Sequence, residues 1–380
     1  MRIVHLCSYI QPQLGYQEYY LAKEHANMGH EVIVISSDRY YPFPDYNNTV
    51  KKILGNRKIG KSDLVYDNFR LIRLNTCFEV KTLIWLKGLG KIIREINPDI
   101  IICHEMTHFN SVRIAKLKKG LNFRLIYDNH NSFIHDFENI IKKIYYLFFN
   151  CNVIKKNADK IIAVTKGGVN YVSKKFKIPS DNIEIIPLGA DINLFYKDEK
   201  KRKIIRNKYN IMMDDFVIIY TGKIIRNKGI HLILEALNKI DKKSNVICMI
   251  VGNGDKEYYD YIEDLSKKYK IKIIKIESVL NKELPAYYSA SDLGVWPVEA
   301  TIGTIEAMAC SLPIICNKDL NERYEKGNGF GISPGNIDEL TEKLNFFIKN
   351  RIKTKEMGEL SKKVVDKNLN WHIIAEKFLE

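Results

Sequence analysis

The feature that most constrains the fold is a regular alternation of short apolar runs and helix-forming segments, which occurs twice along the chain. Runs such as Phe216–Thr221 and Val246–Val251 are rich in β-branched residues and contain almost no charge. This pattern is typical of strands covered on both faces, as in a parallel sheet. Because segments with helical periodicity lie between the runs, the sequence predicts α/β layers and not a meander of hairpins.

The first cycle is predicted to contain seven strands. We place them at Arg2–Ser8, Glu31–Ser36, Phe69–Leu74, Asp99–His104, Phe123–Asp128, Lys160–Thr165 and Ile183–Pro187. Helices are predicted at Tyr16–Met28, Leu83–Ile96, Asn110–Lys119 and Ile140–Lys156. Most of Tyr40–Asn75 is expected to be a long, basic, aromatic loop, a kind of segment that is usually functional or mobile.

The second cycle begins at Phe216 and is predicted to contain five strands. They are Phe216–Thr221, Val246–Val251, Ile271–Ile276, Leu293–Trp296 and Ile314–Cys316. Helices are expected at Gly229–Ile240 and Thr304–Cys310, the latter with Thr304 as its N-cap. A chain of 380 residues is long for one domain and comfortable for two.

The charged stretch Asp191–Asp215 lacks a strong strand pattern and is predicted to hold the domain boundary. We expect two Rossmann-like domains, residues 1–195 and 196–365, and a last helix, residues 366–380, that packs back toward the first domain. Two such domains facing each other would place a ligand between the carboxyl ends of both sheets.

Composition limits the class of protein. The chain is 46% hydrophobic and 28% charged, which is typical of a globular protein, and its formal net charge is +15. That charge suits phosphorylated ligands or anionic lipid, and a solvated basic surface explains it equally well. No dense basic segment names a nucleic-acid module. The seven scattered cysteines indicate buried, reduced thiols, the N-terminus reads as a strand and not as a signal peptide, and no apolar run is long enough to span a membrane.

The segment from Trp296 to Ile315 reads as strand, Gly-containing loop, helix and strand. A helix that starts at the carboxyl end of a parallel strand offers free N–H groups and a positive dipole, so it is a common place to hold a phosphate. Glu306, in the first turn of this helix, could accept hydrogen bonds from a ribose. The alternative is an ordinary first-turn carboxylate.

A second candidate phosphate site follows the strand Phe216–Thr221. Gly222 ends that strand, and Lys223, Arg226 and Lys228 lie on the short loop before the next helix. Three cations at the carboxyl end of a strand could clamp a diphosphate. Solvated loop lysines are the alternative interpretation.

Histidines follow two strands of the first cycle. HEMTH, from His104 to His108, matches the zinc-protease pattern, but that pattern requires both histidines on one helix, whereas His104 ends a predicted strand. We therefore expect no metal there. His130, just past the strand Phe123–Asp128, could hydrogen-bond a sugar hydroxyl or a reacting oxygen, or be a structural histidine.

Several segments together resemble glycosyltransferase family 4, the retaining enzymes of the GT-B fold. Taken in chain order they are HLCSYIQPQLGYQEYYLAKEHANMGHEVIVIS, NADKIIAVT, IEIIPLGADINLF, TGKIIRNKG, VGNGD, ELPAYYSASDLGVWP and IEAMACSLPII. The order and spacing of these segments, which extend over nearly the whole chain, carry the resemblance. It implies a donor-binding C-terminal domain and an acceptor-binding N-terminal domain.

The resemblance also implies roles for individual residues. The implied donor-binding residues are Gly15, Gly222, Lys223, Lys228, Gly303, Thr304 and Glu306, with backbone N–H groups of Gly303 and Thr304 at the diphosphate and Glu306 at the ribose. The implied catalytic residues are His130 near the transferred sugar, Lys223 and Lys228 at the leaving diphosphate, and Glu299 at the sugar.

Three positions depart from the family pattern. The family usually has Gly-Gly in its first loop, where this chain has Gly15-Tyr16, and Lys223 replaces the usual Arg. The two family glutamates are usually separated by seven residues, which would place the first on Val298, but the nearest carboxylate is Glu299. Either the loop has lost one residue and Glu299 still serves, or the sugar contact is missing.

The resemblance predicts transfer of a sugar from a nucleoside diphosphate to an acceptor hydroxyl with retention, without a cofactor or required metal. The partners are then a nucleotide-sugar and a sugar or lipid-linked acceptor, with no nucleic acid. A cytoplasmic location is expected, in which the basic segment 51–61 and the basic, aromatic segment 142–156 could rest on an anionic membrane. Helix core is the other interpretation of the aromatic residues in segment 142–156.

Other functions stay open at this stage. A nucleotide-sugar epimerase or a phosphorylase on the same fold would turn over the donor differently. A non-catalytic sugar-nucleotide-binding subunit would bind nucleotide without turnover. A zinc hydrolase is the third alternative, and metal analysis would decide it.

Overall fold

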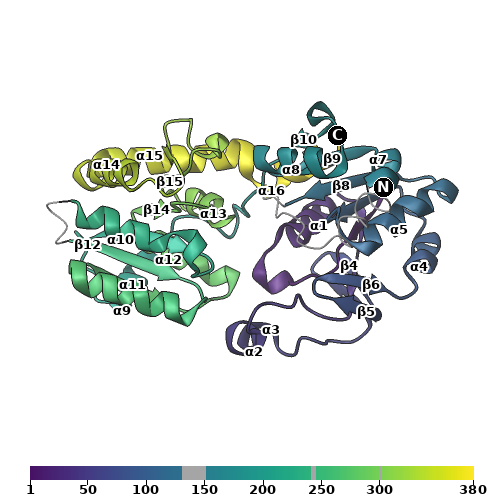
Figure 1. Cartoon of the computed structure of the whole chain (residues 1–380), viewed down its shortest axis with the longest axis horizontal. Helices are drawn as coiled ribbons and strands as arrows, with labels where there is room; N and C mark the ends of the chain where they lie inside the picture. The colour runs from purple at the N-terminus through teal and green to yellow at the C-terminus, as the bar shows by residue number, and fades with distance from the viewer. Residues whose placement is uncertain (131–150, 241–244, 300) are drawn as a thin grey trace. The chain divides into compact units, whose positions relative to one another are not determined.

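The computed structural model describes residues 1–130, 151–240, 245–299 and 301–380. These residues form two compact units. Unit 1 contains Met1–Pro187 together with Ile374–Glu380, and unit 2 contains Leu188–Ile373. Each unit is built on its own mainly parallel sheet with helices beside it (Figure 1).

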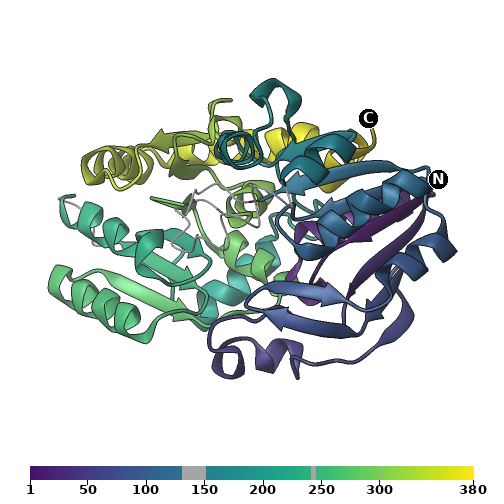
Figure 2. The same cartoon turned by 45° about the vertical axis from the view of Figure 1, so that its right-hand side comes forward.

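Unit 1 contains an eight-stranded sheet in the order β10-β9-β8-β7-β1-β2-β4-β3. Neighbouring strands pair in parallel, except for β3 and β4, which are antiparallel. Figure 2 shows the strands of this sheet side by side. The strands are β1 (Arg2–Leu6), β2 (Glu31–Ser37), β3 (Ser62–Tyr66), β4 (Phe69–Leu74), β7 (Ile100–His104), β8 (Arg124–Asn129), β9 (Lys160–Ala163) and β10 (Glu184–Ile185).

The helices of unit 1 connect these strands in sequence, so that most connections are βαβ crossovers. They are α1 (Gln17–Asn27), α2 (Tyr46–Thr49), α3 (Lys51–Leu54), α4 (Leu89–Ile96), α5 (Phe109–Leu117), α7 (Cys151–Asn157) and α8 (Lys166–Phe176), with short 3-10 turns η1 (Pro12–Leu14), η2 (Lys118–Gly120) and η4 (Ser180–Asn182). The predicted helix Ile140–Lys156 lies mostly outside the described residues, and its end is α7.

Unit 2 contains a six-stranded sheet, all parallel, in the order β13-β12-β11-β14-β15-β16. The strands are β11 (Phe216–Thr221), β12 (Val246–Val251), β13 (Lys272–Ile276), β14 (Leu293–Val295), β15 (Ile314–Asn317) and β16 (Gly329–Ile332). Its core is a single cluster of buried aliphatic and aromatic side chains, including the wholly buried Trp296.

The helices of unit 2 alternate with these strands. They are α9 (Glu199–Lys208), α10 (Ile230–Asn238), α11 (Lys256–Tyr269), α12 (Leu284–Ala290), α13 (Gly303–Ala309), α14 (Ile337–Lys349) and α15 (Arg351–Val364), with short turns η5 (Arg226–Lys228), η6 (Asn281–Glu283), η7 (Asn321–Arg323) and the π-helical η8 (Val365–Leu369). The last helix, α16 (Trp371–Leu379), continues from η8.

The end of α16 belongs to unit 1. There the carbonyl of Leu379 accepts a hydrogen bond of 2.5 Å from Arg124, and that of Lys377 accepts one of 2.7 Å from Lys160. The Ala375 carbonyl accepts a hydrogen bond of 2.9 Å from His25. Three side chains of the sheet and of α1 therefore hold backbone acceptors of the last helix.

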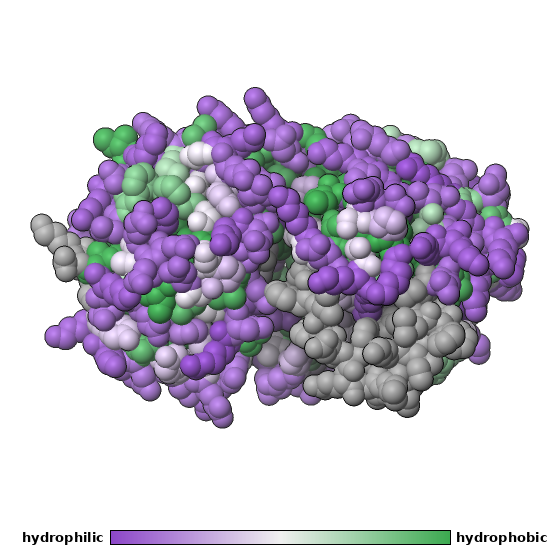
Figure 3. Space-filling view, turned by 45° about the horizontal axis from the view of Figure 1, so that its top comes forward, coloured by the Kyte–Doolittle hydropathy of each residue, from purple (hydrophilic) through white to green (hydrophobic). Residues whose placement is uncertain are grey.

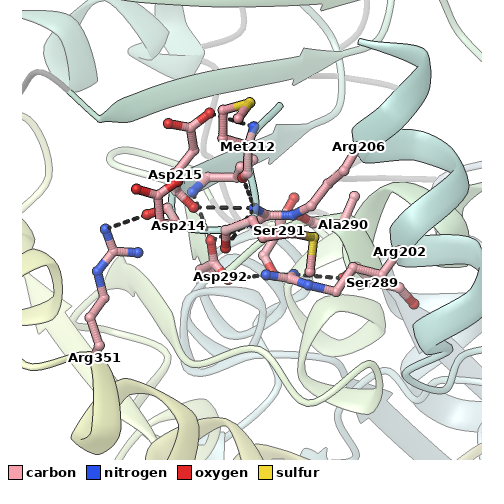
Figure 4. A network of polar contacts seen from close by, with 12 residues as sticks. Arg202, Arg206, Met212, Asp214, Asp215, Ser289, Ala290, Ser291, Asp292 and Arg351 are labelled. Atoms are coloured by element: carbon pink, nitrogen blue, oxygen red, sulfur yellow. Dashed lines mark hydrogen bonds and ion pairs between the residues drawn. The ribbon is translucent and has the colours of Figure 1, made fainter. Parts of the chain in front are cut away.

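A buried arginine network attaches α9 to the body of unit 2 (Figure 4). Arg206 is fully buried, and Asp292 receives one N–H from Arg206 and one from Arg202, each at 2.8 Å. Asp292 also accepts the backbone N–H of Val217 at 2.9 Å, and the remaining N–H groups of Arg206 reach backbone carbonyls. Because both charges and most of their donors are satisfied, the network fixes α9 to the end of α12 and, through Asp292, to the start of β11.

The structure corrects four predicted elements. Leu83–Leu86, expected to begin a helix, is instead strand β6, which pairs antiparallel with β5 (Thr76–Val80). The predicted long loop at Tyr40–Asn75 contains α2, α3 and the edge strand β3. Strand β16 was not predicted, because its glycines weaken the strand signal.

The fourth correction concerns Thr304, which is the second residue of α13 and not its N-cap; Ile302 holds the cap position. Among the six cysteines whose side chains the structure describes, the prediction of burial is wrong only at Cys77, which is exposed, and the prediction for Cys151 lies outside the described side chains. Cys7, Cys103, Cys248, Cys310 and Cys316 are buried thiols, and all six are free.

Candidate active site

In unit 2 the order of the strands reverses direction between β11 and β14, which pair with each other although β12 and β13 lie between them in the chain. Loops that leave two such strands at their carboxyl ends diverge and leave room for a ligand. The loop after β11 contains Gly222 to Gly229, and the loop after β14 leads to Gly303. The donor residues predicted in unit 2 therefore follow these two neighbouring strands, whereas Gly15 belongs to unit 1.

Glycines allow these loops to approach one another closely. Gly222 has φ 139°, and its carbonyl lies so near Gly252 (φ 148°) that a Cβ on Gly252 would overlap it. Gly229 has φ 70°, and a Cβ there would lie 2.6 Å from Cγ2 of Val298. These three conformations favour glycine, and the absence of side chains lets the loop after β11 lie directly against the segments that contain Gly252 and Val298.

The three cations of this loop have different surroundings. Lys228 forms an ion pair with Glu299, in which Nζ contacts Oε2. The guanidinium of Arg226 lies 5.0 Å from the centre of the Tyr261 ring, so it is held by a cation–π contact. Lys223 is exposed. The structure thus brings Lys228 and Glu299 together and directs Arg226 toward α11.

The start of α13 is organised by Thr301. The N–H of Gly303 donates to Oγ1 of Thr301 at 3.2 Å, and the N–H of Thr304 donates to its carbonyl at 3.2 Å. The Thr304 hydroxyl donates to the same carbonyl at 2.9 Å. The two N–H groups that the resemblance assigns to the diphosphate are thus already hydrogen-bonded in the ligand-free protein.

Arg323, which the sequence analysis missed, lies behind this turn. It is 3% exposed, and its Nη1 donates to the Thr301 carbonyl at 2.9 Å and also contacts Oγ1 of Thr304. Its Nε is buried and lacks a hydrogen-bond partner among the described atoms, while Glu322 lies 3.6 Å away. The sequence around Arg323 is polar, so nothing in it predicts that this side chain is buried.

Glu306 lies in the first turn of α13 and is 2% exposed. Asn281 donates to its Oε1 at 3.2 Å, and the Tyr288 hydroxyl donates to its Oε2 at 3.3 Å. Burial raises the pKa of Glu306 to about 7, although both hydrogen bonds act in the opposite direction. Glu306 is therefore a buried carboxyl group that is only partly ionised near neutral pH.

Unit 1 has a corresponding reversal of strand order between β1 and β7. Gly15 follows η1 after β1 and is left-handed, with φ 65°, and its N–H donates to the Pro12 carbonyl at 3.1 Å. Tyr16, where the family usually has a second glycine, is 36% exposed and precedes α1. The predicted Gly loop is therefore present as a tight turn before a helix.

His130 follows β8 and lies beside Asp128, with 3.5 Å between Nε2 and Oδ2. Burial would lower the pKa of His130, but the carboxylate of Asp128 outweighs this effect and raises the pKa to about 9. His104 ends β7 and His108 is the N-cap of α5, so the two histidines of HEMTH do not share a helix. The geometry required by the zinc-protease pattern is therefore missing, as expected.

Two family models match this chain in succession. Residues 17–194 match the model described as Glycosyltransferase Family 4, and residues 201–364 match that described as Glycosyl transferases group 1. With the two parallel sheets and the positions of Gly15, Lys228 and Glu306, these matches define the class of protein as a GT-B glycosyltransferase. The chain belongs to the group 1 glycosyltransferases with a family 4 N-terminal half.

Relatives that match most of this chain are named as glycosyltransferases or as a glycolipid synthase. The chain is 26% identical to an uncharacterized glycosyltransferase of Methanocaldococcus jannaschii, covering 84% of this chain and 81% of that protein. It is 27% identical to the alpha-monoglucosyldiacylglycerol synthase of Acholeplasma laidlawii, covering 77% and 73%. It is 21% identical to a lipopolysaccharide 1,2-N-acetylglucosaminetransferase of Salmonella typhimurium, covering 76% and 74%.

Solved structures confirm the GT-B fold. Anabaena HepE in complex with UDP superposes with a TM-score of 0.74 at 16% identity, covering all of this chain and 98% of that chain. Sucrose-phosphate synthase from Thermosynechococcus elongatus gives 0.73 at 18% identity, with 99% and 96% covered. Among the described residues, no helix combines the length and the apolar character that crossing a membrane requires.

Proposed function

We propose that this glycosyltransferase moves a sugar from a nucleoside diphosphate to an acceptor hydroxyl with retention at the anomeric carbon. One observation carries the proposal: Lys228, Glu299 and the buried carboxyl of Glu306 gather at the strand reversal of unit 2. Unit 2 is then the donor domain and unit 1 the acceptor domain. The complex of a structural neighbour with UDP supports a uridine nucleotide as the first donor to test.

Each donor contact follows from the chemistry of a side chain. Glu306 would accept the ribose hydroxyls in place of its present donors. Lys223 and Lys228 would face the diphosphate, and the N–H groups of Gly303 and Thr304 would reach it once Thr301 releases them. Gly222 and Gly15 would allow the backbone to approach the diphosphate and the transferred sugar.

Catalysis would depend on stabilising the departing diphosphate. In the step that we propose, the bond between the anomeric carbon and the phosphate oxygen breaks while the acceptor oxygen attacks the same face. The acceptor proton passes to the leaving phosphate. Loss of one preorganised donor to such developing charge typically costs about 3 kcal/mol of transition-state stabilisation. Glu299 would contact the sugar, and His130 would do so from unit 1.

We propose that no metal ion or cofactor is required, because lysines and backbone N–H groups supply the charge that a divalent ion would otherwise provide. Lys replaces the usual Arg at position 223, so a point charge takes the place of a bidentate contact there. Activity that survives excess EDTA would support this proposal, and its loss and recovery on adding Mg²⁺ or Mn²⁺ would overturn it.

The decisive experiment is a thermal-shift screen with UDP, GDP, ADP and their sugars in the presence of EDTA. A ligand at 100 times its dissociation constant should stabilise the protein by about 2.7 kcal/mol. Glu306→Ala should abolish the shift, whereas Glu359→Ala, which removes an exposed glutamate on α15, should retain it. If no nucleotide stabilises the wild-type protein, the donor-site assignment is wrong.

For the acceptor we propose a lipid-linked sugar at an anionic membrane surface. Two relatives are named for the synthesis of a diacylglycerol glycolipid and for sugar transfer to lipopolysaccharide. Unit 1 also exposes apolar side chains near its basic segment 51–61: Ile59, Leu64, Val65, Phe78 and Val80. Most of the face seen in Figure 3 is hydrophilic, with apolar residues scattered across it. Exposed apolar side chains among lysines suit a charged lipid surface.

Flotation with vesicles that contain anionic lipid tests the membrane proposal. The wild-type protein should float, and Val65→Ser combined with Phe78→Ser should reduce flotation. Ile352→Ser is the matched control, since Ile352 is similarly exposed but lies in unit 2. A wild-type protein that stays at the bottom of the gradient contradicts membrane association without affecting the donor-site proposal.

A further inference from the structure

Asp128 is the centre of a buried hydrogen-bond network in unit 1 that the proposed transfer reaction does not use directly. Its side chain is fully buried at the end of β8. Its Oδ2 accepts hydrogen bonds from Nε2 of Gln17 at 2.9 Å and from Nδ1 of His104 at 2.8 Å, and it lies 3.5 Å from Nε2 of His130. Three side chains therefore converge on one carboxylate oxygen.

A chain of imidazole rings continues the network away from Asp128. Nε2 of His104 lies 3.0 Å from Nδ1 of His5, and Nε2 of His5 lies 3.0 Å from Nδ1 of His25. Nε2 of His25 lies 2.9 Å from the carbonyl of Ala375 on α16. His5 and His25 are fully buried and His104 nearly so, and the chain links the carboxyl end of β8 to the last helix.

Counting protons determines the charge of this chain. Four hydrogen bonds join three imidazoles to two end groups, a carboxylate and a carbonyl, which can only accept. Four bonds need four ring protons, whereas three neutral imidazoles carry three. The chain therefore holds one extra proton, so that one of the three rings is an imidazolium.

The extra proton belongs on His104. Burial lowers the pKa of His5 well below its ordinary value and lowers that of His25 to about 4, so both rings stay neutral at physiological pH. His104 is the ring that contacts the carboxylate. Burial would raise the pKa of Asp128, but His104 and His130 outweigh this effect and lower it, so Asp128 is ionised. The result is a buried imidazolium–carboxylate pair.

We infer that Asp128 is a positioning residue for His130, and that the His104–His5–His25 chain keeps the Asp128 carboxylate ionised and fixed. This inference rests on the role of His130 in the proposed transfer. Contact with Asp128 at Nε2 sets the orientation of the His130 ring and favours its protonated form. The carboxylates of Glu18 and Glu105 act on the charge of His130 in the same direction. A fixed imidazolium can then donate Nδ1–H to the transferred sugar or to developing negative charge.

A metal ion is the competing explanation of the same residues. Ligand atoms of His104, Asp128 and His130 all lie within 4.8 Å of one another, and an ion on Nδ1 of His104 would satisfy the chain without the extra proton. However, two ligands of a tetrahedral zinc ion are about 3.3 Å apart. The 2.8 Å between Nδ1 of His104 and Oδ2 of Asp128 is the length of a direct hydrogen bond.

The first test needs no variant. In wild-type protein with isotopically labelled histidine, NMR near neutral pH should detect both ring N–H groups of His104 and one each on His5 and His25. His130 should lose its proton at about pH 9. Only three N–H groups in the chain, or stoichiometric metal in purified protein, would overturn the inference.

The second test compares Asp128→Asn with Gln17→Leu, which removes a neutral donor to the same carboxylate. Asp128→Asn should shift the titration of His130 to lower pH by more than one unit, lower kcat by roughly 100-fold and leave the KM of the donor nearly unchanged. Gln17→Leu should do much less. An unchanged titration of His130 in Asp128→Asn contradicts the inference. Because the NMR result does not depend on turnover, a protein inactive on every acceptor would contradict the proposed function alone.

Discussion

Binding of a nucleotide-sugar should strengthen as the pH rises through neutrality, because Glu306 must be ionised to accept two ribose hydroxyls. In the ligand-free protein, burial raises the pKa of Glu306 from 4.5 to about 7. Hydroxyl groups that donate to the carboxylate favour its charged form. Binding therefore selects the ionised state, which is the minor state below pH 7.

The size of the effect follows from the fraction ionised. With a pKa of about 7, roughly one tenth of Glu306 is ionised at about pH 6 and nine tenths at about pH 8. The dissociation constant should therefore be about tenfold larger at pH 6 than at pH 8, which means weaker binding at the lower pH. The same shift of the pKa means that Glu306 makes a contribution to the free energy of unfolding that is fully present below its unfolded pKa of 4.5. This contribution is lost as the pH rises through the folded pKa of about 7. The loss is on the order of 3 kcal/mol.

Isothermal titration calorimetry at constant ionic strength is the appropriate measurement. The ligand should be an intact nucleotide-sugar, since both of its phosphates are esterified and neither titrates near pH 7, unlike the terminal phosphate of a free diphosphate. Glu306→Gln should bind more weakly without the pH dependence, and above pH 7 it should be more stable than the wild-type protein. Affinity that is flat from pH 6 to 8, or an equal slope in the variant, would refute the reasoning.

Three further predictions concern unit 2. Gly303→Ala should lower the free energy of unfolding in urea by about 1–3 kcal/mol, because the new Cβ would overlap Oγ1 of Thr221; an unchanged midpoint would contradict the close contact. Asp292→Ala should lower it by about 3–5 kcal/mol, because it leaves the buried Arg206 without its carboxylate; a smaller loss than for an exposed ion pair would show that backbone carbonyls suffice. Lys228→Ala should lower kcat/KM by about 100-fold or more, as expected for loss of one charge-stabilising donor, and steady-state kinetics showing an unchanged value would exclude Lys228 from the diphosphate site.

Most of the parallel strands were predictable because each of them carries its own apolar signal. Phe216–Thr221 and Val246–Val251 are buried on both faces and occur at the predicted bounds. Strands that depend on a partner were missed. Leu83–Leu86 forms a strand because it pairs with Thr76–Val80, and Gly329–Ile332 does so because it lies beside β15. In neither case can the pairing be inferred from a local pattern.

The candidate site divides in the same way. Lys228 and Glu306 are identified by a loop and a helix whose positions follow from the strand pattern. The contact between Lys228 and Glu299, residues 71 apart in the chain, depends on the pairing of β11 with β14. The importance of Arg323 and Asp128 depends on their being buried. The sequence does not show this, because charged residues are usually exposed. The histidine chain needed β1, β7, β8 and α1 to be brought together.

At the donor site Lys228 and the N–H groups of Gly303 and Thr304 already have partners within the protein. Lys228 is paired with Glu299, so a diphosphate must compete with a carboxylate for that lysine. A complete nucleotide-sugar offers hydroxyl donors to the released Glu299, whereas a free diphosphate leaves it unpaired. Glu299→Gln should therefore tighten binding of the free nucleoside diphosphate and weaken binding of the nucleotide-sugar. Calorimetry with both ligands measures this difference, and a shift of both affinities in one direction would show that Glu299 does not exchange Lys228 for the sugar.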